Sequence, residues 1–165
     1  MSNYHVIIPN DVVNGEGVCV SLFVQGCPHH CKGCFNEETW DFQEGKPIDS
    51  SAVKEILEAI RANGMQRNFS VLGGEPLALL NIKDVAEIIL AVRRTYPDIK
   101  ISVWTGYLFN EITNKWGKLI LNNIDYLIDG PFIEEEKDLS LKWRGSKNQH
   151  IYWKNRETNK WELLE

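Results

Sequence analysis

Hydrophobic and polar positions along the chain follow two periods that alternate from one end to the other. Short runs rich in β-branched residues, each followed within two residues by glycine, predict four strands at 18–24, 69–72, 99–104 and 124–128. Apolar residues spaced three and four apart predict helices across 53–60 and 82–92, and a weaker helix within 108–121. Because strands and helices alternate, we expect parallel strands joined by helical crossovers.

The length of the chain limits what this alternation can build. It has 165 residues, whereas a closed eight-stranded β/α barrel needs about 250. We therefore expect an α/β fold that is either an open sheet or part of a barrel. The carboxyl ends of parallel strands are where such folds bind ligands. The cysteine-rich loop and the segments at Gly73, Thr105 and Asp129 are thus expected to face one site.

The end of the chain carries a different pattern. Ile151–Trp153 and Trp161–Leu163 flank a short polar stretch, which is typical of a β-hairpin. We accordingly divide the chain into a main domain, residues 1–149, and a C-terminal tail, residues 150–165. Between Lys142 and Lys160 there are six basic residues and one acidic residue, a pattern that a solvated surface explains.

Composition and charge exclude several classes of protein. Apolar residues make up 43% and charged residues 25% of the chain, the usual globular balance. The net charge of −5 argues against a nucleic-acid partner, which would have to bind the basic stretch alone. The longest apolar run is Ile88–Val92, far short of the ~20 residues that span a membrane. The N-terminus lacks a secretion signal, so we expect a cytoplasmic protein without a membrane partner.

The cysteines indicate a metal site. All four lie between positions 19 and 34, and Cys27, Cys31 and Cys34 form a C-x3-C-x2-C loop. Such crowding does not suit a disulfide framework, which joins distant segments. Three thiolates on one short loop hold three corners of an iron–sulfur cube and leave its fourth iron open. The alternative is structural zinc, which takes four protein ligands, with His29 or His30 as the fourth.

Cys19 does not suit the role of a fourth ligand. It begins the predicted strand 18–24, so it lies about 17 Å below the strand's end at ~3.3 Å per residue. A small buried strand residue is the simpler interpretation of Cys19.

Several short motifs follow one another in a fixed order. Gly73-Gly74-Glu75-Pro76 comes one predicted crossover after the cysteine loop. The others are Asn14–Gly17, Phe23–Cys27, Gly33–Asn36, Thr39-Trp40, Trp104–Tyr107, Asp129–Phe132 and Trp143–Ser146. In this order the chain resembles radical S-adenosylmethionine enzymes, and among them the activating proteins of anaerobic ribonucleoside-triphosphate reductase. The resemblance covers about Asn3 to Gln149.

Two features differ from the pattern of the superfamily. Many of its members carry an aromatic residue just before the last cysteine of the loop, where this chain has Gly33. The activating proteins share this glycine and place the aromatic residue after the cysteine, as Phe35 stands here. The segment from His150 onward lies outside the resemblance.

The resemblance implies a fold, two cofactors and a reaction. The fold would be an incomplete parallel β/α barrel of the radical S-adenosylmethionine type. Cys27, Cys31 and Cys34 would hold one 4Fe-4S cluster, and S-adenosylmethionine would bind its open iron. Reductive cleavage would give a 5′-deoxyadenosyl radical, which would take hydrogen from a glycine Cα in the large subunit of the reductase. A low-potential electron donor such as flavodoxin would supply the electron.

The resemblance also implies which residues bind the cofactor, and no catalytic residue beyond the cluster and the cofactor. Backbone groups of Gly73 and Gly74, together with the Glu75 carboxylate, would meet the methionyl ammonium. Near the last ligand, Gly33, Cys34 and Phe35 would lie beside the adenine and the cluster. Thr105 and Asp129 would reach ribose or carboxylate groups. Ordinary turns explain Thr105 and Asp129 equally well, and core packing explains Phe35 nearly as well. A strand-ending turn would also explain Gly73-Gly74, but the cysteine loop favours the cofactor-binding role there.

Two other functions stay open at the level of sequence. The chain could be a different small radical S-adenosylmethionine enzyme, acting on a nucleotide or a peptide, which would turn over without the reductase. It could also be a metal module without catalysis, either a zinc-stabilised adaptor or an electron carrier. The Gly73–Pro76 motif speaks against this second class, which has no use for S-adenosylmethionine.

Overall fold

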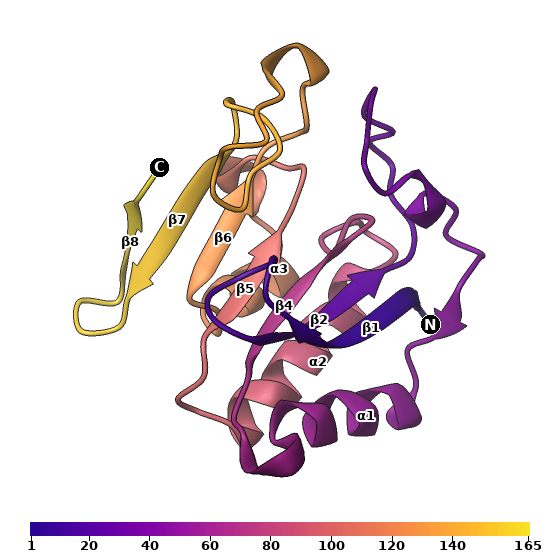
Figure 1. Ribbon diagram of the computed structural model, residues 1–165, viewed down its shortest axis with the longest axis vertical. Coiled ribbons are helices and arrows are strands. Elements are labelled where there is room, and N and C mark those ends of the chain that lie inside the picture. Colours follow the sequence, from indigo (N-terminus) through magenta and orange to yellow (C-terminus); the bar gives the residue numbers. More distant parts are fainter.

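The computed structural model describes residues 1–165 and contains a single eight-stranded sheet (Figure 1). The strands are β1 (Asn3–Asp11), β2 (Cys19–Val24), β3 (Lys46–Pro47), β4 (Asn68–Gly73), β5 (Ile101–Trp104), β6 (Tyr126–Asp129), β7 (His150–Asn155) and β8 (Lys160–Leu163). The helices are α1 (Ser50–Ile60), α2 (Ile82–Thr95) and α3 (Lys115–Leu121), with 3-10 turns η1 (Glu37–Thr39), η2 (Ala62–Gly64), η3 (Phe109–Glu111) and η4 (Glu134–Glu136). No helix has the length and apolar character needed to cross a membrane.

The centre of the sheet consists of parallel strands in chain order. β2 pairs with β4, β4 with β5, and β5 with β6, and α1, α2 and α3 lie in the connections between them. The predicted α/β fold with helical crossovers is thereby confirmed. The full strand order is β3-β1-β2-β4-β5-β6-β7-β8, so the sheet has two free edges and is open.

Two strands on the N-terminal side were absent from the expectation. β1 pairs antiparallel with β2, and the two-residue β3 pairs with β1 at the edge of the sheet. β1 has no regular alternation of buried and exposed residues, and its register shifts twice along β2. An edge strand of this kind is hard to find from periodicity because only part of one face is buried.

The core lies between the sheet and the helices, which lie together on one side of it (Figure 1). Alternate residues of the parallel strands point to this side, and the fully buried ones among them include Leu22, Phe69 and Ile101. They pack in one cluster with Ile56 of α1 and with apolar residues of α2. Each fully buried aliphatic side chain of this kind contributes about 1.5–3 kcal/mol relative to exposure.

The other side of the sheet is covered by the segment between β1 and β2, which crosses it in Figure 1. Small side chains make this possible: Ser21, Ser70 and Ser102 stand in register across three strands. Ser70 donates a hydrogen bond to a backbone carbonyl in the crossing segment, at 2.7 Å. A Cβ on Gly15 of that segment would lie 2.6 Å from the Ser70 hydroxyl, so the segment lies directly on the sheet.

The C-terminal residues form a β-hairpin that extends the sheet. β7 pairs antiparallel with β6 and with β8. Asp125, just before β6, joins the hairpin to the helical layer, because it accepts hydrogen bonds from Arg93 of α2 and Arg156 of the hairpin turn, at 2.7 and 2.6 Å. Burial alone would raise the pKa of Asp125, but hydrogen bonds from Arg156 and Ile101 and the charge of Arg93 outweigh it and lower the pKa.

We expect the substitution Asp125→Asn to lower the free energy of unfolding by about 3 kcal/mol, because it leaves two arginines near the core without their counter-charge. Because the folded pKa is lowered, this stabilisation is complete above the ordinary carboxyl pKa of about 3.9 and is lost as the pH falls through the folded value. Urea unfolding of the wild-type protein and of Asp125→Asn, from pH 8 to pH 3, measures the difference in their free energies of unfolding. The exposed Glu157→Gln is the control, and equal stability of the two variants at neutral pH would contradict the role of Asp125.

Candidate functional site

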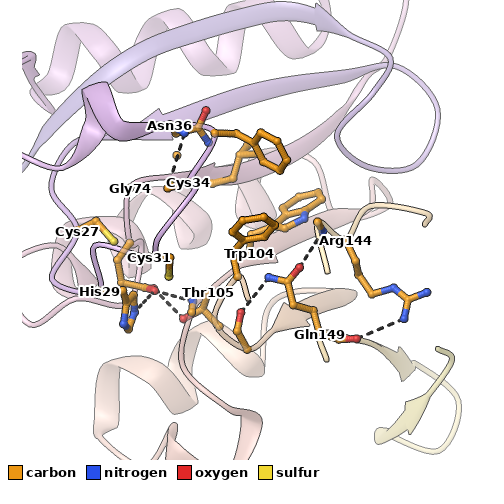
Figure 2. Close-up of a pocket in the computed structure, with 18 of the residues that line it drawn as sticks. Cys27, His29, Cys31, Cys34, Asn36, Gly74, Trp104, Thr105, Arg144 and Gln149 are labelled. Atoms are coloured by element: carbon orange, nitrogen blue, oxygen red, sulfur yellow. Dashed lines mark hydrogen bonds and ion pairs between the residues drawn. The ribbon is translucent and has the colours of Figure 1, made fainter. Parts of the chain in front are cut away.

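A cavity of about 540 Å³ lies at the carboxyl ends of the parallel strands, as expected for this type of sheet. Its walls come from five parts of the chain. They are Val13 and Asn14 between β1 and β2, the cysteine loop after β2, Leu72–Glu75 at the end of β4, Trp104–Gly106 at the end of β5, and residues from Gly130 to Gln149 after β6. Figure 2 shows the cysteines on one side and Arg144 and Gln149 on the other. The volume lies in the range of about 300–1,000 Å³ that small-molecule sites occupy.

Backbone hydrogen bonds hold the cysteine loop over the end of β2. The amide of Gly26 donates to the carbonyl of Thr39 at 2.6 Å, and that of Cys27 donates to the carbonyl of Trp40 at 3.1 Å. Within the loop, the amide of Cys34 donates to the carbonyl of Cys31. All three cysteines are half-buried and line the cavity. The loop therefore presents its three thiols toward one space.

Two of the three sulfur atoms, those of Cys27 and Cys34, receive hydrogen bonds from backbone amides. The amide of Asn36 donates to the Cys34 sulfur at 3.4 Å. Burial raises the pKa of the Cys27 thiol to about 11, and the Glu75 charge adds to this rise, whereas the backbone amides of His29 and His30 lower the pKa. A metal that binds the Cys27 thiolate would therefore have to displace a proton that the thiol holds tightly.

The arrangement suits a cluster better than a single ion. The two candidates for a fourth zinc ligand have other partners: His29 bonds to Glu75, and His30 stacks on Trp40 at 4.3 Å. Three thiols without a fourth protein ligand are the donor set of an iron–sulfur cube with one open iron.

Cys19 lies away from this loop, as expected. It begins β2 and is buried, and its thiol donates to the carbonyl of Glu16 at 3.3 Å. Burial, the largest effect on this thiol, raises the pKa of Cys19.

Gly73 and Gly74 let two backbone segments meet at the cavity wall. Gly73 has φ of +114°, and a Cβ there would lie 2.7 Å from the amide nitrogen of Val24 on β2. A Cβ on Gly74 would lie 2.4 Å from the carbonyl oxygen of Gly26, so only glycine fits at this position. The carbonyl oxygen of Gly74 accepts no hydrogen bond from the chain, whereas its amide donates to Val24. An unpaired acceptor thus lies on the cavity wall.

The Glu75 carboxylate has partners within the chain. The side chain is 1% exposed, and it accepts from the Thr105 hydroxyl and the Gly106 amide, each at 2.7 Å, and from the Leu77 amide at 2.9 Å. Its fourth partner is the His29 ring, at 2.7 Å. These contacts, part of which Figure 2 shows, use the hydrogen-bonding capacity of both oxygens.

The other residues expected to bind the cofactor lie at different depths. Thr105 is buried and lines the cavity. Phe35 is 55% exposed and stands at the rim, 5.2 Å from the ring of Phe132. Asp129 is buried below the cavity, where it bonds to the His150 ring and the Phe109 amide. Gly33 lies outside the cavity wall and faces the side chain of Glu134.

The wall opposite the cysteines contains residues to which the sequence assigned no role. The indole of Trp104 donates to the carbonyl of Trp143, whose φ of +56° is rare for a bulky residue. The Gln149 amide joins Gly130 to Gly145. The motifs Trp104–Tyr107, Asp129–Phe132 and Trp143–Ser146 each contain residues of this wall, but the sequence did not show that they lie together, because these contacts join segments that are distant in sequence.

Two buried N–H groups on the cavity wall have no acceptor. They are Nε1 of Trp40 and Nε of Arg144, and both residues line the cavity from different segments. Buried donors are nearly always paired in folded proteins, so these two indicate a ligand that offers acceptor atoms.

Comparisons with known proteins agree with the cysteine loop and the cavity. Residues 13–152 match the family model described as "4Fe-4S single cluster domain". The chain is 42% identical over 151 residues to the anaerobic ribonucleoside-triphosphate reductase-activating protein of Haemophilus influenzae, covering 91% of this chain and 97% of the relative. The proteins of the same name from Escherichia coli K12 and from Enterobacteria phage T4 are 38% and 37% identical, over 91% and 93% of this chain and 97% and 94% of theirs.

Identity at this level over nearly the whole length of both chains establishes the family. The region that matches the family model, residues 13–152, includes the cysteine loop and every other residue that lines the cavity. The chain belongs to the family of anaerobic ribonucleoside-triphosphate reductase-activating proteins, with a 4Fe-4S single cluster domain.

Proposed function

We propose that the chain is a radical S-adenosylmethionine oxidoreductase that activates an anaerobic ribonucleoside-triphosphate reductase by making a glycyl radical in its large subunit. One observation carries the proposal: a loop with three thiols, whose two histidines have other partners, lines a cavity on the same wall as the Gly73–Glu75 turn. A structural zinc ion is enclosed by four protein ligands and needs no neighbouring cavity for a small molecule. A 4Fe-4S cluster with one open iron needs a cavity to hold the molecule that binds there.

The residues of the cysteine loop would hold the cluster. Cys27, Cys31 and Cys34 would each ligate one iron, and the Asn36 amide would donate to the Cys34 sulfur. When bound, the reduced cluster supplies the electron that cleaves S-adenosylmethionine to methionine and a 5′-deoxyadenosyl radical, which takes hydrogen from a glycine Cα of the reductase. The chain's own part is to orient the reactants and to exclude competing reactions.

The residues at the strand ends would bind S-adenosylmethionine. The free carbonyl of Gly74 is an acceptor for the methionyl ammonium, and Gly73 allows the close approach of the backbone there. Thr105 lies on the same wall, where it would face the cofactor, and Phe35 would pack at the rim. Gly33 and Asp129 would act from outside the wall, by shaping the cysteine loop and the segment after β5.

We also propose that the open sheet is an incomplete β/α barrel of the radical S-adenosylmethionine type. Its parallel strands follow one another in chain order and its helices lie on one side, as in a barrel. A barrel that stays open leaves room for a glycine-bearing segment of the large subunit to reach the cavity. Residues 1–149 would form this activase domain, and the tail 150–165 would complete its edge.

The remaining partners follow from the chemistry. The cluster needs a low-potential electron donor, such as flavodoxin, and no membrane or nucleic acid takes part. All four cysteines are free thiols, which suits the reducing cytoplasm.

We expect anaerobically reconstituted protein to generate a glycyl radical when it is mixed with reductant, S-adenosylmethionine and the reductase large subunit. Electron paramagnetic resonance of the frozen mixture measures this radical as a doublet, which is split by the remaining α-hydrogen of the glycine. The splitting should collapse when the subunit carries α-deuterated glycine. Omission of S-adenosylmethionine is the control. Cleavage of S-adenosylmethionine at full rate with no radical on the subunit would contradict the proposed target and favour a small-molecule or peptide substrate.

Removal of one thiol should abolish cluster binding. We expect Cys27→Ala, Cys31→Ala and Cys34→Ala each to lose the visible absorption and most of the bound iron after reconstitution, because each thiolate holds a separate corner of the cube. The matched control is Cys19→Ala, which removes a buried thiol outside the loop and should keep the full iron content. Full iron content in any of the three loop variants would contradict the assigned ligands.

A further inference from the structure

The Glu75 carboxylate joins three segments that are distant in sequence. Leu77 belongs to its own turn after β4, Thr105 and Gly106 follow β5, and His29 lies in the cysteine loop. Its carboxylate therefore sits where the ends of two strands and the loop with the thiols meet. With 1% of the residue exposed, these contacts are shielded from water.

The contacts require a carboxylate, because both oxygens must accept. Oε1 accepts the Leu77 amide and the Thr105 hydroxyl, and Oε2 accepts the Gly106 amide. A backbone N–H can only donate, so an amide side chain would put its NH₂ group against one N–H in either orientation. Since Oε2 is an acceptor, the His29 ring donates its Nε2 hydrogen to it.

His29 also fills the space between the loop and the segment after β5. Its ring packs edge-on against Tyr107, with centroids 4.6 Å apart at 70°. A Cβ on Gly106 would lie 2.6 Å from the ring, so the imidazole touches the backbone there. His29 stands between Cys27 and Cys31 in the sequence, and its position therefore constrains both ligands.

We propose that His29 and Glu75 are a positioning pair that holds the cysteine loop in its ligand-presenting shape before any cofactor binds. This inference rests on the proposed function, because it concerns the same site. The alternative role for the carboxylate, direct contact with the methionyl ammonium, would require Glu75 to give up partners that use both its oxygens. The pair instead couples the cluster loop to the strand ends that form the cofactor's side of the cavity.

The test uses three variants and a control from the same loop. His29→Phe keeps an aromatic ring beside Tyr107 but cannot donate, whereas His29→Gln restores a donor at the reach of Nε2. Glu75→Gln keeps one acceptor oxygen, and when that oxygen accepts from Leu77 and Thr105, the NH₂ group faces Gly106 and His29 in place of Oε2. The control is Lys32→Gln, a residue whose side chain is 84% exposed and touches Glu134 rather than Glu75.

Two measurements are made without S-adenosylmethionine. The first is hydrogen exchange of the Cys27 and Cys34 amides, both hydrogen-bonded, in metal-free protein. The second is the rate at which a chelator removes iron from the reconstituted, reduced protein. We expect both rates to rise about tenfold or more in His29→Phe, the cost of a charge-assisted hydrogen bond, and to return within about threefold of the wild-type rate in His29→Gln.

The double variant separates a pair from two independent residues. His29→Phe combined with Glu75→Gln should lose iron no faster than Glu75→Gln alone, because the second change removes a contact that is already lost. Additive effects, or unchanged exchange and iron loss in His29→Phe, would overturn the proposal. If Glu75→Gln does not fold, the His29 variants and their rescue decide the question.

The test of the positioning pair does not depend on whether the chain cleaves S-adenosylmethionine. Unchanged loop exchange in His29→Phe together with intact S-adenosylmethionine cleavage would overturn the positioning pair and leave the proposed function standing. Faster loop exchange in His29→Phe, together with a wild-type chain that never cleaves S-adenosylmethionine, would support the positioning pair and contradict the proposed function, since the exchange is measured on metal-free protein.

Discussion

The parallel register of β2 and β4 is the constraint on which the site depends. Val24 stands beside Gly73, so the cysteine loop and the Gly73–Glu75 turn leave the sheet next to each other. Gly73 and Gly74 let the two backbones approach so closely that a Cβ at either position would collide with the other segment. The amides of Gly74 and Glu75 donate to the carbonyls of Val24 and Gly26. The thiols and the free carbonyl of Gly74 therefore share one wall because of main-chain hydrogen bonds.

The strands that follow complete the cavity in the same way. β5 brings Thr105 and Gly106 to the Glu75 carboxylate, and β6 leads into the segment whose Trp143 meets Trp104. The hairpin protects the far edge of this arrangement, since Asp125 ties Arg156 to the helical layer and His150 of β7 bonds to Asp129. In the proposed function, a frame of this kind would hold the reactive cofactor away from groups that would quench it.

Periodicity predicted the parallel centre of the sheet because those strands are buried on both sides and end at glycines. It missed β1, which has an irregular burial pattern and is covered on its outer side only by the two-residue strand β3. The ligand loop was predictable because three cysteines within eight residues have few uses in a chain of this kind. The partners of Glu75 could not be predicted, because residues 29, 105 and 106 are distant in sequence and periodicity does not bring them together.

The central claim is that the cluster held by the cysteine loop keeps one iron open for S-adenosylmethionine. Electron–nuclear double resonance of the reduced protein with S-adenosylmethionine labelled with ¹⁵N at the amino group tests it directly. The account predicts a hyperfine coupling between the cluster and the labelled nitrogen, with an altered cluster spectrum. A cluster spectrum that is the same with and without S-adenosylmethionine, and no coupling, would contradict the account and leave an electron-carrying or structural metal module.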